Sequence, residues 1–132
     1  MTDLKPKVLI VDDDKFLIDM YALKFTKKGY EVNTSLNGSD ALTKLRDGYV
    51  PDVIVCDIIM PVMDGLKFLE NMRAEKLAPK AAVVVLSNQG QHEDIENAQA
   101  FNIDGYIIKA LTIPSEVIDQ VDTVYRGKVN IS

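Results

Sequence analysis

Short apolar runs alternate with helix-period segments along the whole chain. The runs stand at 7–11, 30–35, 52–56, 81–86 and 105–108, and three of them are apolar at nearly every position. Continuous apolar runs of this length are typical of strands that are buried on both faces of a parallel sheet. Between the runs, apolar residues recur at helical spacing, so the pattern predicts an α/β fold with five strands and five helices.

Capping and turn residues predict where the helices begin and end. Leu17, Met20, Tyr21 and Phe25 lie at offsets 0, 3, 4 and 8 and predict the inward face of the first helix. The first helix is expected to end near Gly29, the second to cover about 39–47, and the third to begin near Asp64 or Gly65. The fourth is expected to begin near His92 and to have a left-handed cap at Asn102, and the last is expected to begin at Pro114.

Composition and charge narrow the class of protein. A chain of 132 residues that is 47% hydrophobic is long enough for one buried core, so we expect a single domain over 1–132 without an output domain. The net charge of -5 argues against a general electrostatic grip on nucleic acid or an anionic membrane. A single cysteine, no long apolar run and no signal-peptide pattern make the cytoplasm the expected location.

Polar residues follow the predicted strands at the point where each strand ends. Asp12 and Asp13 follow the first strand, Asp57 the third and Ser87 the fourth, and Lys109 stands near the end of the fifth. The carboxyl ends of parallel strands share one edge of the sheet, where ligands bind in open α/β folds. We therefore expect three carboxylates, a hydroxyl and an ammonium to meet there, a set that suits Mg²⁺ and a phosphoryl group.

Each of these residues also has a simpler interpretation. Asp14, directly before the first helix, is better explained as a helix N-cap, and Cys56 as a small core residue. Ser87 or Lys109 alone would mean little. Asp57 differs because it is flanked by apolar residues on both sides, where an unpaired carboxylate is costly. The joint placement of the five residues is the functional signal.

The segments "VDDD", "DIIMPVMDG", "VVLS" and "GYIIK", in this order and spacing, resemble the receiver domain of two-component response regulators. The resemblance covers essentially the whole chain and is most specific between Asp57 and Gly65. It implies a doubly wound, flavodoxin-like parallel sheet with strand order 2-1-3-4-5. The site roles that it implies are a phospho-acceptor at Asp57, Mg²⁺ ligands at Asp12, Asp13, Asp57 and the backbone carbonyl of Ile59, a phosphate-binding lysine at Lys109, and a switch pair of Ser87 and Tyr106.

The same resemblance implies a function in phosphorelay signalling. Asp57 would take a phosphoryl group from the phosphohistidine of a sensor kinase or phosphotransfer protein in a Mg²⁺-dependent reaction. The chain would catalyse only its own phosphorylation and dephosphorylation and would not otherwise be an enzyme. Its output would be contact with a downstream protein through the fourth helix, fifth strand and fifth helix, or a homodimer formed on phosphorylation, without direct contact with nucleic acid or membrane.

The chain departs from the family pattern after Lys109. The family usually has a proline next, joined by a cis bond, whereas this chain has Ala110. Because a cis bond before any other residue costs about 2.5–4 kcal/mol, we expect a trans bond or a rearranged loop there.

Two other functions stay open from the sequence. One is a pseudo-receiver that binds partners without being phosphorylated, although none of the charged residues that the chemistry needs is missing. The other is a phosphatase of the haloacid dehalogenase type with Asp12 as its nucleophile, since Asp12 and Asp14 form an Asp-x-Asp pair after the first strand. That family expects Thr or Val where Phe16 stands.

Overall fold

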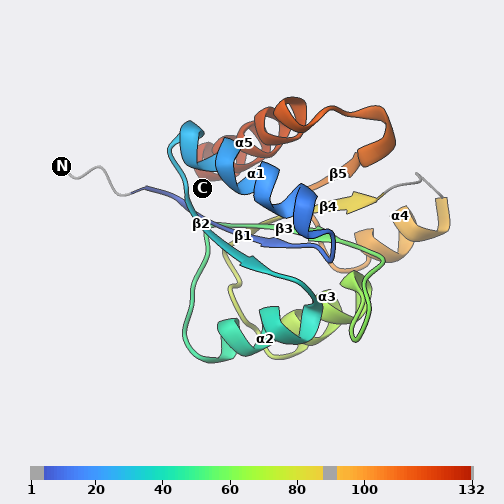
Figure 1. Cartoon of the computed structure of the whole chain (residues 1–132). Coiled ribbons are helices and arrows are strands. Elements are labelled where there is room, and N and C mark those ends of the chain that lie inside the picture. Colours follow the sequence, from blue (N-terminus) through green and yellow to red (C-terminus); the bar gives the residue numbers. More distant parts are fainter. Residues whose placement is uncertain (1–4, 88–91, 132) are drawn as a thin grey trace.

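Five parallel strands form one sheet in the order β2-β1-β3-β4-β5 (Figure 1). The structure is a computed structural model that describes residues 5–87 and 92–131. The strands are β1 (Lys7–Val11), β2 (Glu31–Ser35), β3 (Val53–Asp57), β4 (Ala82–Ser87) and β5 (Gly105–Ile108). The helices are α1 (Lys15–Lys28), α2 (Gly38–Arg46), α3 (Gly65–Ala74), α4 (His92–Gln99) and α5 (Pro114–Ile131). The predicted fold class, strand order and five helices are confirmed.

The sheet separates two layers of helices. Helices α1 and α5 cover one face, and α2, α3 and α4 cover the other (Figure 1). In β1, Val8 and Ile10 point into the core under α1 and α5, whereas Leu9 and Val11 point into the opposite core. All four are fully buried, which explains why the strand is apolar at successive positions rather than alternate ones.

Helix α1 begins and ends where the sequence predicted. The side chain of Asp14 accepts a hydrogen bond from the Leu17 backbone N–H, and Gly29 adopts a left-handed conformation with φ of 102°. The predicted inward face was partly wrong, because Ile18 is buried whereas Met20 is only partly buried. The helix itself carries apolar residues on its exposed side as well, such as Phe16 and Leu23, so their spacing alone could not identify the buried face.

The other helix ends also follow local signals. Asn37 and Asp64 cap α2 and α3 by accepting hydrogen bonds from backbone N–H groups three residues later. Asn102 adopts the predicted left-handed conformation, with φ of 58°, and Pro114 is the first residue of α5. His92 is the first residue of α4, as predicted, and its side chain lies outside the described part of the structure.

The connection from β5 to α5 contains a short 3-10 turn over Lys109–Leu111. Since the described residues include no cis peptide bond, the bond between Lys109 and Ala110 is trans, as expected from the missing proline. The turn places Lys109 directly beyond the carboxyl end of β5.

Candidate functional site

Three aspartates meet at the carboxyl edge of the sheet. Asp12 follows β1 and Asp57 ends β3, and these two strands are neighbours paired in register. One carboxylate oxygen from each of Asp12, Asp13 and Asp57 lies within 4.8 Å of the others. Asp12 and Asp57 are buried and Asp13 is exposed. The predicted acidic cluster is therefore present, and it opens to solvent on the side of Asp13.

Lys109 joins the two buried aspartates. Its Nζ lies 2.6 Å from Oδ2 of Asp12 and 3.3 Å from Oδ2 of Asp57, and the lysine side chain is only 7% exposed. The second oxygen of Asp12 accepts a hydrogen bond of 2.9 Å from the backbone N–H of Asp14. The resting lysine thus binds Asp12 more closely than the proposed acceptor Asp57.

The surroundings of Asp57 raise its proton affinity. Burial raises the pKa of Asp57 to about 6, the charge of Asp12 raises it too, and Lys109 and the Ile58 backbone N–H oppose both effects. The Ile58 N–H donates to Oδ1 of Asp57 at 2.9 Å. For Lys109, burial works to lower the pKa, but the hydrogen bond and charge of Asp12 outweigh it and the pKa is raised. The lysine stays charged and Asp57 is mostly ionised at neutral pH, as a carboxylate nucleophile requires.

The loop after Asp57 is held close to the strand by Gly65. A methyl group on Gly65 would lie 2.1 Å from the backbone oxygen of Asp57, and the Gly65 N–H donates to the carbonyl of Ile58 at 2.7 Å. Val62 in this loop has a left-handed φ of 69°, which is rare for a β-branched residue. The sequence placed Gly65 near a helix start and at the end of the motif that begins at Asp57, and in the structure it is also the residue that permits close packing behind Asp57.

Of the remaining predicted residues, Ser87 and Ile59 lie at the same edge, whereas Tyr106 lies further back in β5, paired with Val85. Ser87 is buried at the end of β4, and Tyr106 in β5 packs against the core under α2, α3 and α4. The Tyr106 hydroxyl is fully enclosed and has no hydrogen-bond partner among the described residues. Ile59 is exposed, and its backbone carbonyl accepts no hydrogen bond from the described part of the chain. That carbonyl is therefore available to a ligand.

These donors suit a hard divalent cation. Three carboxylates and one ammonium leave an excess of negative charge, and all the proposed donor atoms are oxygens, which Mg²⁺ prefers. The cluster also accounts for an apolar strand that leads directly into three aspartates. Asp14 caps α1, whereas Asp12 and Asp13 belong to the acidic site.

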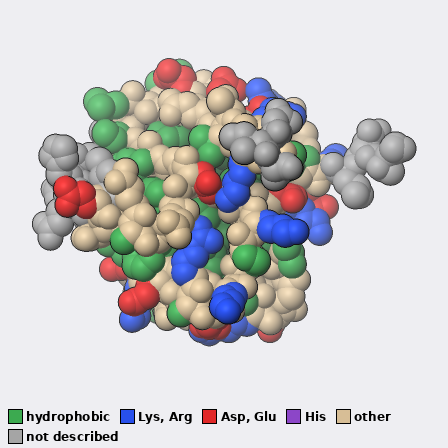
Figure 2. Space-filling model, turned by 180° about the vertical axis from the view of Figure 1, so that it is seen from behind, with side chains coloured by type: hydrophobic (Ala, Val, Ile, Leu, Met, Phe, Trp, Pro, Cys, Tyr) green, Lys and Arg blue, Asp and Glu red, His purple; other side chains and the backbone are tan. Residues whose placement is uncertain are grey.

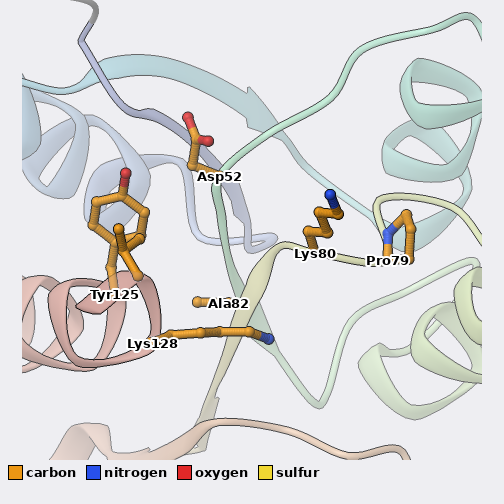
Figure 3. Close-up of a pocket in the computed structure, with 7 residues that line it drawn as sticks. Asp52, Pro79, Lys80, Ala82, Tyr125 and Lys128 are labelled. Atoms are coloured by element: carbon orange, nitrogen blue, oxygen red, sulfur yellow. The ribbon is translucent and has the colours of Figure 1, made fainter. Parts of the chain in front are cut away.

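A separate hollow lies at the opposite edge of the sheet (Figure 3). It has a volume of about 470 Å³, and its walls include Lys80, Tyr125 and Lys128 around Ala82 at the start of β4. Lys128 donates hydrogen bonds to the carbonyl of Ala81 and to Asp104. None of the acidic-site residues lines this hollow, so the two features are independent.

Comparison with known proteins places these features in a family. The model of the response regulator receiver domain matches residues 8–122. The chemotaxis protein CheY of Thermotoga maritima is 34% identical over 121 residues, which cover 91% of this chain and 98% of that protein. A probable transcriptional regulator, ycf27, of Pyropia yezoensis is 31% identical over 96% of this chain but only 50% of its own length. The chain thus spans about half the length of several curated relatives that it matches.

Solved structures agree with the fold. A CheY-like receiver domain protein from Methanospirillum hungatei has a TM-score of 0.87 at 23% identity and covers 98% of this chain and all of that one. The chemotaxis protein CheY4 of Vibrio cholerae has a TM-score of 0.83 at 28% identity, with 92% and 99% of the two chains covered. Within the described residues, no helix is long and apolar enough to cross a membrane.

Proposed function

The chain belongs to the response regulator receiver domain family, and we propose that it is a phosphoryl-accepting switch with Asp57 as the acceptor. The observation that carries this proposal is the placement of Asp57 against Asp12, Asp13 and Lys109 at the carboxyl edge of the sheet. The chemistry needs little more than positioning and charge neutralisation, since phosphoryl transfer has a loose transition state with charge spread over the phosphoryl oxygens.

The proposed step moves one phosphoryl group. A carboxylate oxygen of Asp57 attacks phosphorus, the new O–P bond forms, and the N–P bond to the donor histidine breaks with its electrons remaining on the imidazole. Lys109 neutralises one phosphoryl oxygen, and the Ser87 hydroxyl donates a hydrogen bond to another. Mg²⁺, held by Asp12, Asp13, Asp57 and the Ile59 carbonyl, would neutralise the remaining charge.

Exposed apolar side chains support a protein as the phosphoryl donor. Six large hydrophobic residues in the segments that follow strands β1, β2, β3 and β5 are each at least 46% exposed, and we call them the apolar rim: Phe16, Leu36, Ile59, Val62, Leu111 and Ile113. Part of this edge lies at the left of Figure 2, where hydrophobic side chains gather. Exposed apolar groups concentrated around a reactive residue indicate a contact surface for a protein partner. We propose that this partner is a sensor histidine kinase or phosphotransfer protein.

The output is proposed to depend on Tyr106. Its enclosed hydroxyl lacks a partner in the described chain, and an unpaired buried hydroxyl costs about 1–3 kcal/mol. This cost reduces the free-energy difference between the inward position of the Tyr106 ring and a position in which its hydroxyl reaches water. A shift of Ser87 toward a phosphoryl group on Asp57 would change that balance and alter the surface of α4, β5 and α5 on which a downstream protein or a second copy binds.

The test is phosphorylation by a small donor. The protein is incubated with acetyl phosphate and Mg²⁺, and intact masses of the wild type and Asp57→Ala are compared. We expect the wild type to gain one phosphoryl group, the variant none, and neither to gain one in chelator. A gain in both proteins would reject Asp57 as the acceptor. No gain in either would favour the pseudo-receiver, a binding module without phosphorylation.

The comparisons do not favour the dehalogenase-type phosphatase. In the structure, one oxygen of Asp12 is bound by the Asp14 backbone N–H and the other by Lys109. Within the described residues, Asp57 is contacted by the Ile58 N–H on Oδ1 and, at a longer distance, by Lys109 on Oδ2. Asp57 is the less constrained nucleophile.

A further inference from the structure

Tyr21 is a buried tyrosine that the proposed chemistry leaves without a role. It lies on the inward face of α1 between Ile18 and Phe25 and is only 2% exposed. Its ring packs in the core under α1 and α5, together with Ile107 of β5. A leucine or phenylalanine would fill such a position equally well, so the hydroxyl needs its own explanation.

The Tyr21 hydroxyl reaches the surface without a partner in the described part of the chain. It makes no hydrogen bond with the described residues, and it is not among the fully enclosed oxygens that lack a partner, which are Ser35 Oγ and Tyr106 Oη. The small exposed area of Tyr21 therefore includes its hydroxyl. The ring is buried while its polar tip meets solvent.

The direction of α1 shows where this tip opens. The helix starts at the acidic edge, directly after its cap Asp14, and Tyr21 stands six residues into it, or about 9 Å along the axis at 1.5 Å per residue. Side chains of a helix lean toward its N-terminus, so the ring points back toward the edge that carries Asp12 and Asp57.

The charges around Tyr21 agree with this direction. Burial raises the pKa of the Tyr21 phenol, and the charged groups that act on it are Lys109, Asp12, Asp57 and Asp14, all of them at the acidic edge. The influence is mutual, because Tyr21 is among the groups that raise the pKa of Lys109. By contrast, Tyr30, which is equally buried in the same core, donates its hydroxyl to Asp122 at 2.7 Å and lies among other charges.

We propose that Tyr21 is a positioning residue whose hydroxyl accepts a hydrogen bond from the Lys109 ammonium when Asp12 and Asp57 bind Mg²⁺ and the phosphoryl group. In the resting structure two of the three ammonium donors serve Asp12 and Asp57. Once the aspartates bind metal and phosphoryl, the lysine loses those anchors and has to stay on a phosphoryl oxygen. A fixed acceptor beside it limits the positions that its flexible stem can adopt.

The inference rests on the proposed function, and two single-atom deletions test it. Tyr21→Phe removes only the hydroxyl in question, and Tyr30→Phe removes the hydroxyl of the other buried tyrosine in the same core. Three quantities are measured for the wild type and both variants: the rate of Asp57 phosphorylation by acetyl phosphate with Mg²⁺, the affinity for fluoroberyllate in the presence of Mg²⁺, and the melting temperature in chelator.

We expect Tyr21→Phe to be phosphorylated about fivefold more slowly and to bind fluoroberyllate about fivefold more weakly, the equivalent of one hydrogen bond. Its metal-free melting temperature should be unchanged, because the resting Lys109 is held by Asp12. Tyr30→Phe should melt lower, through loss of the Asp122 hydrogen bond, and be phosphorylated at the wild-type rate. The proposal is overturned if Tyr21→Phe reacts and binds as the wild type does, or if both variants slow equally. Absence of phosphorylation in the wild type would instead reject the proposed function.

Discussion

Neutralising the acceptor is expected to stabilise the metal-free protein. Burial and the neighbouring Asp12 raise the pKa of Asp57 to about 6, compared with about 3.9 for an unperturbed aspartate. The folded state therefore binds the Asp57 proton more tightly than the unfolded state does. The stability associated with that proton is fully present below about pH 4 and is lost as the pH rises through about 6.

The size of the effect follows from the two pKa values. A difference of about two units corresponds to about 3 kcal/mol at 1.36 kcal/mol per unit, and partial contact of the cluster with solvent should reduce it to about 2 kcal/mol. Asp57→Asn keeps the shape of the side chain and removes its charge, whereas Lys109 keeps its closer partner Asp12. The variant should therefore be more stable than the wild type by about 2 kcal/mol at pH 7.5 in chelator.

Urea unfolding in chelator between pH 4.5 and 8 measures this difference. The advantage of Asp57→Asn should shrink steadily below pH 6 and fall to less than half of its pH 7.5 value at pH 4.5. Asp47→Asn is the control, since Asp47 is exposed at the end of α2, away from the acidic edge, and should change stability by less than about 0.5 kcal/mol. A variant less stable than the wild type at pH 7.5, or an advantage independent of pH, would refute the reasoning.

Three further substitutions probe the same edge. Asp13→Asn should melt higher than the wild type in chelator, by the equivalent of about 1 kcal/mol of relieved repulsion, and gain far less from added Mg²⁺; equal Mg²⁺ shifts in a thermal melt would make Asp13 a plain surface residue. Val62→Asn should raise the free energy of unfolding by about 1 kcal/mol in calorimetry, because Val62 is 84% exposed and adopts a left-handed conformation that asparagine tolerates better. A lower melting temperature of the variant would contradict this. Ser35→Ala should raise the free energy of unfolding in urea by about 1 kcal/mol, since it removes an enclosed hydroxyl without a partner in the described chain. A lower free energy of unfolding would mean that a bound water satisfies the Ser35 hydroxyl.

Much of the fold could be predicted because the strands are buried on both faces. A run such as Val8–Val11 has no polar position, which is typical of a central parallel strand covered on both sides. The next residue along the chain then lies at the carboxyl edge, so Asp12 and Asp57 could be placed together without coordinates. The helix ends could be predicted for a different reason. Caps such as Asp14 and Gly29 act on residues that are close in sequence.

Features that depend on distances between distant segments could not be predicted. The preference of Lys109 for Asp12 over Asp57 follows from where the 3-10 turn after β5 leaves the lysine. The contact of Gly65 with the backbone of Asp57 depends on how α3 approaches β3. The spacing of apolar residues placed Tyr21 correctly in the core, but spacing has no information about where the tip of a side chain opens.

The apolar rim has a consequence for how copies of this chain behave at high concentration. At neutral pH a net charge of -5 keeps molecules apart, and that repulsion vanishes near the isoelectric point of about 4.8. The six exposed hydrophobic side chains on this edge of one molecule can then contact those of another molecule without net electrostatic repulsion. Mild acid should therefore drive reversible clustering through the same edge that is proposed to receive the phosphoryl donor. A surface suited to transient binding of a partner therefore also promotes self-association of the protein.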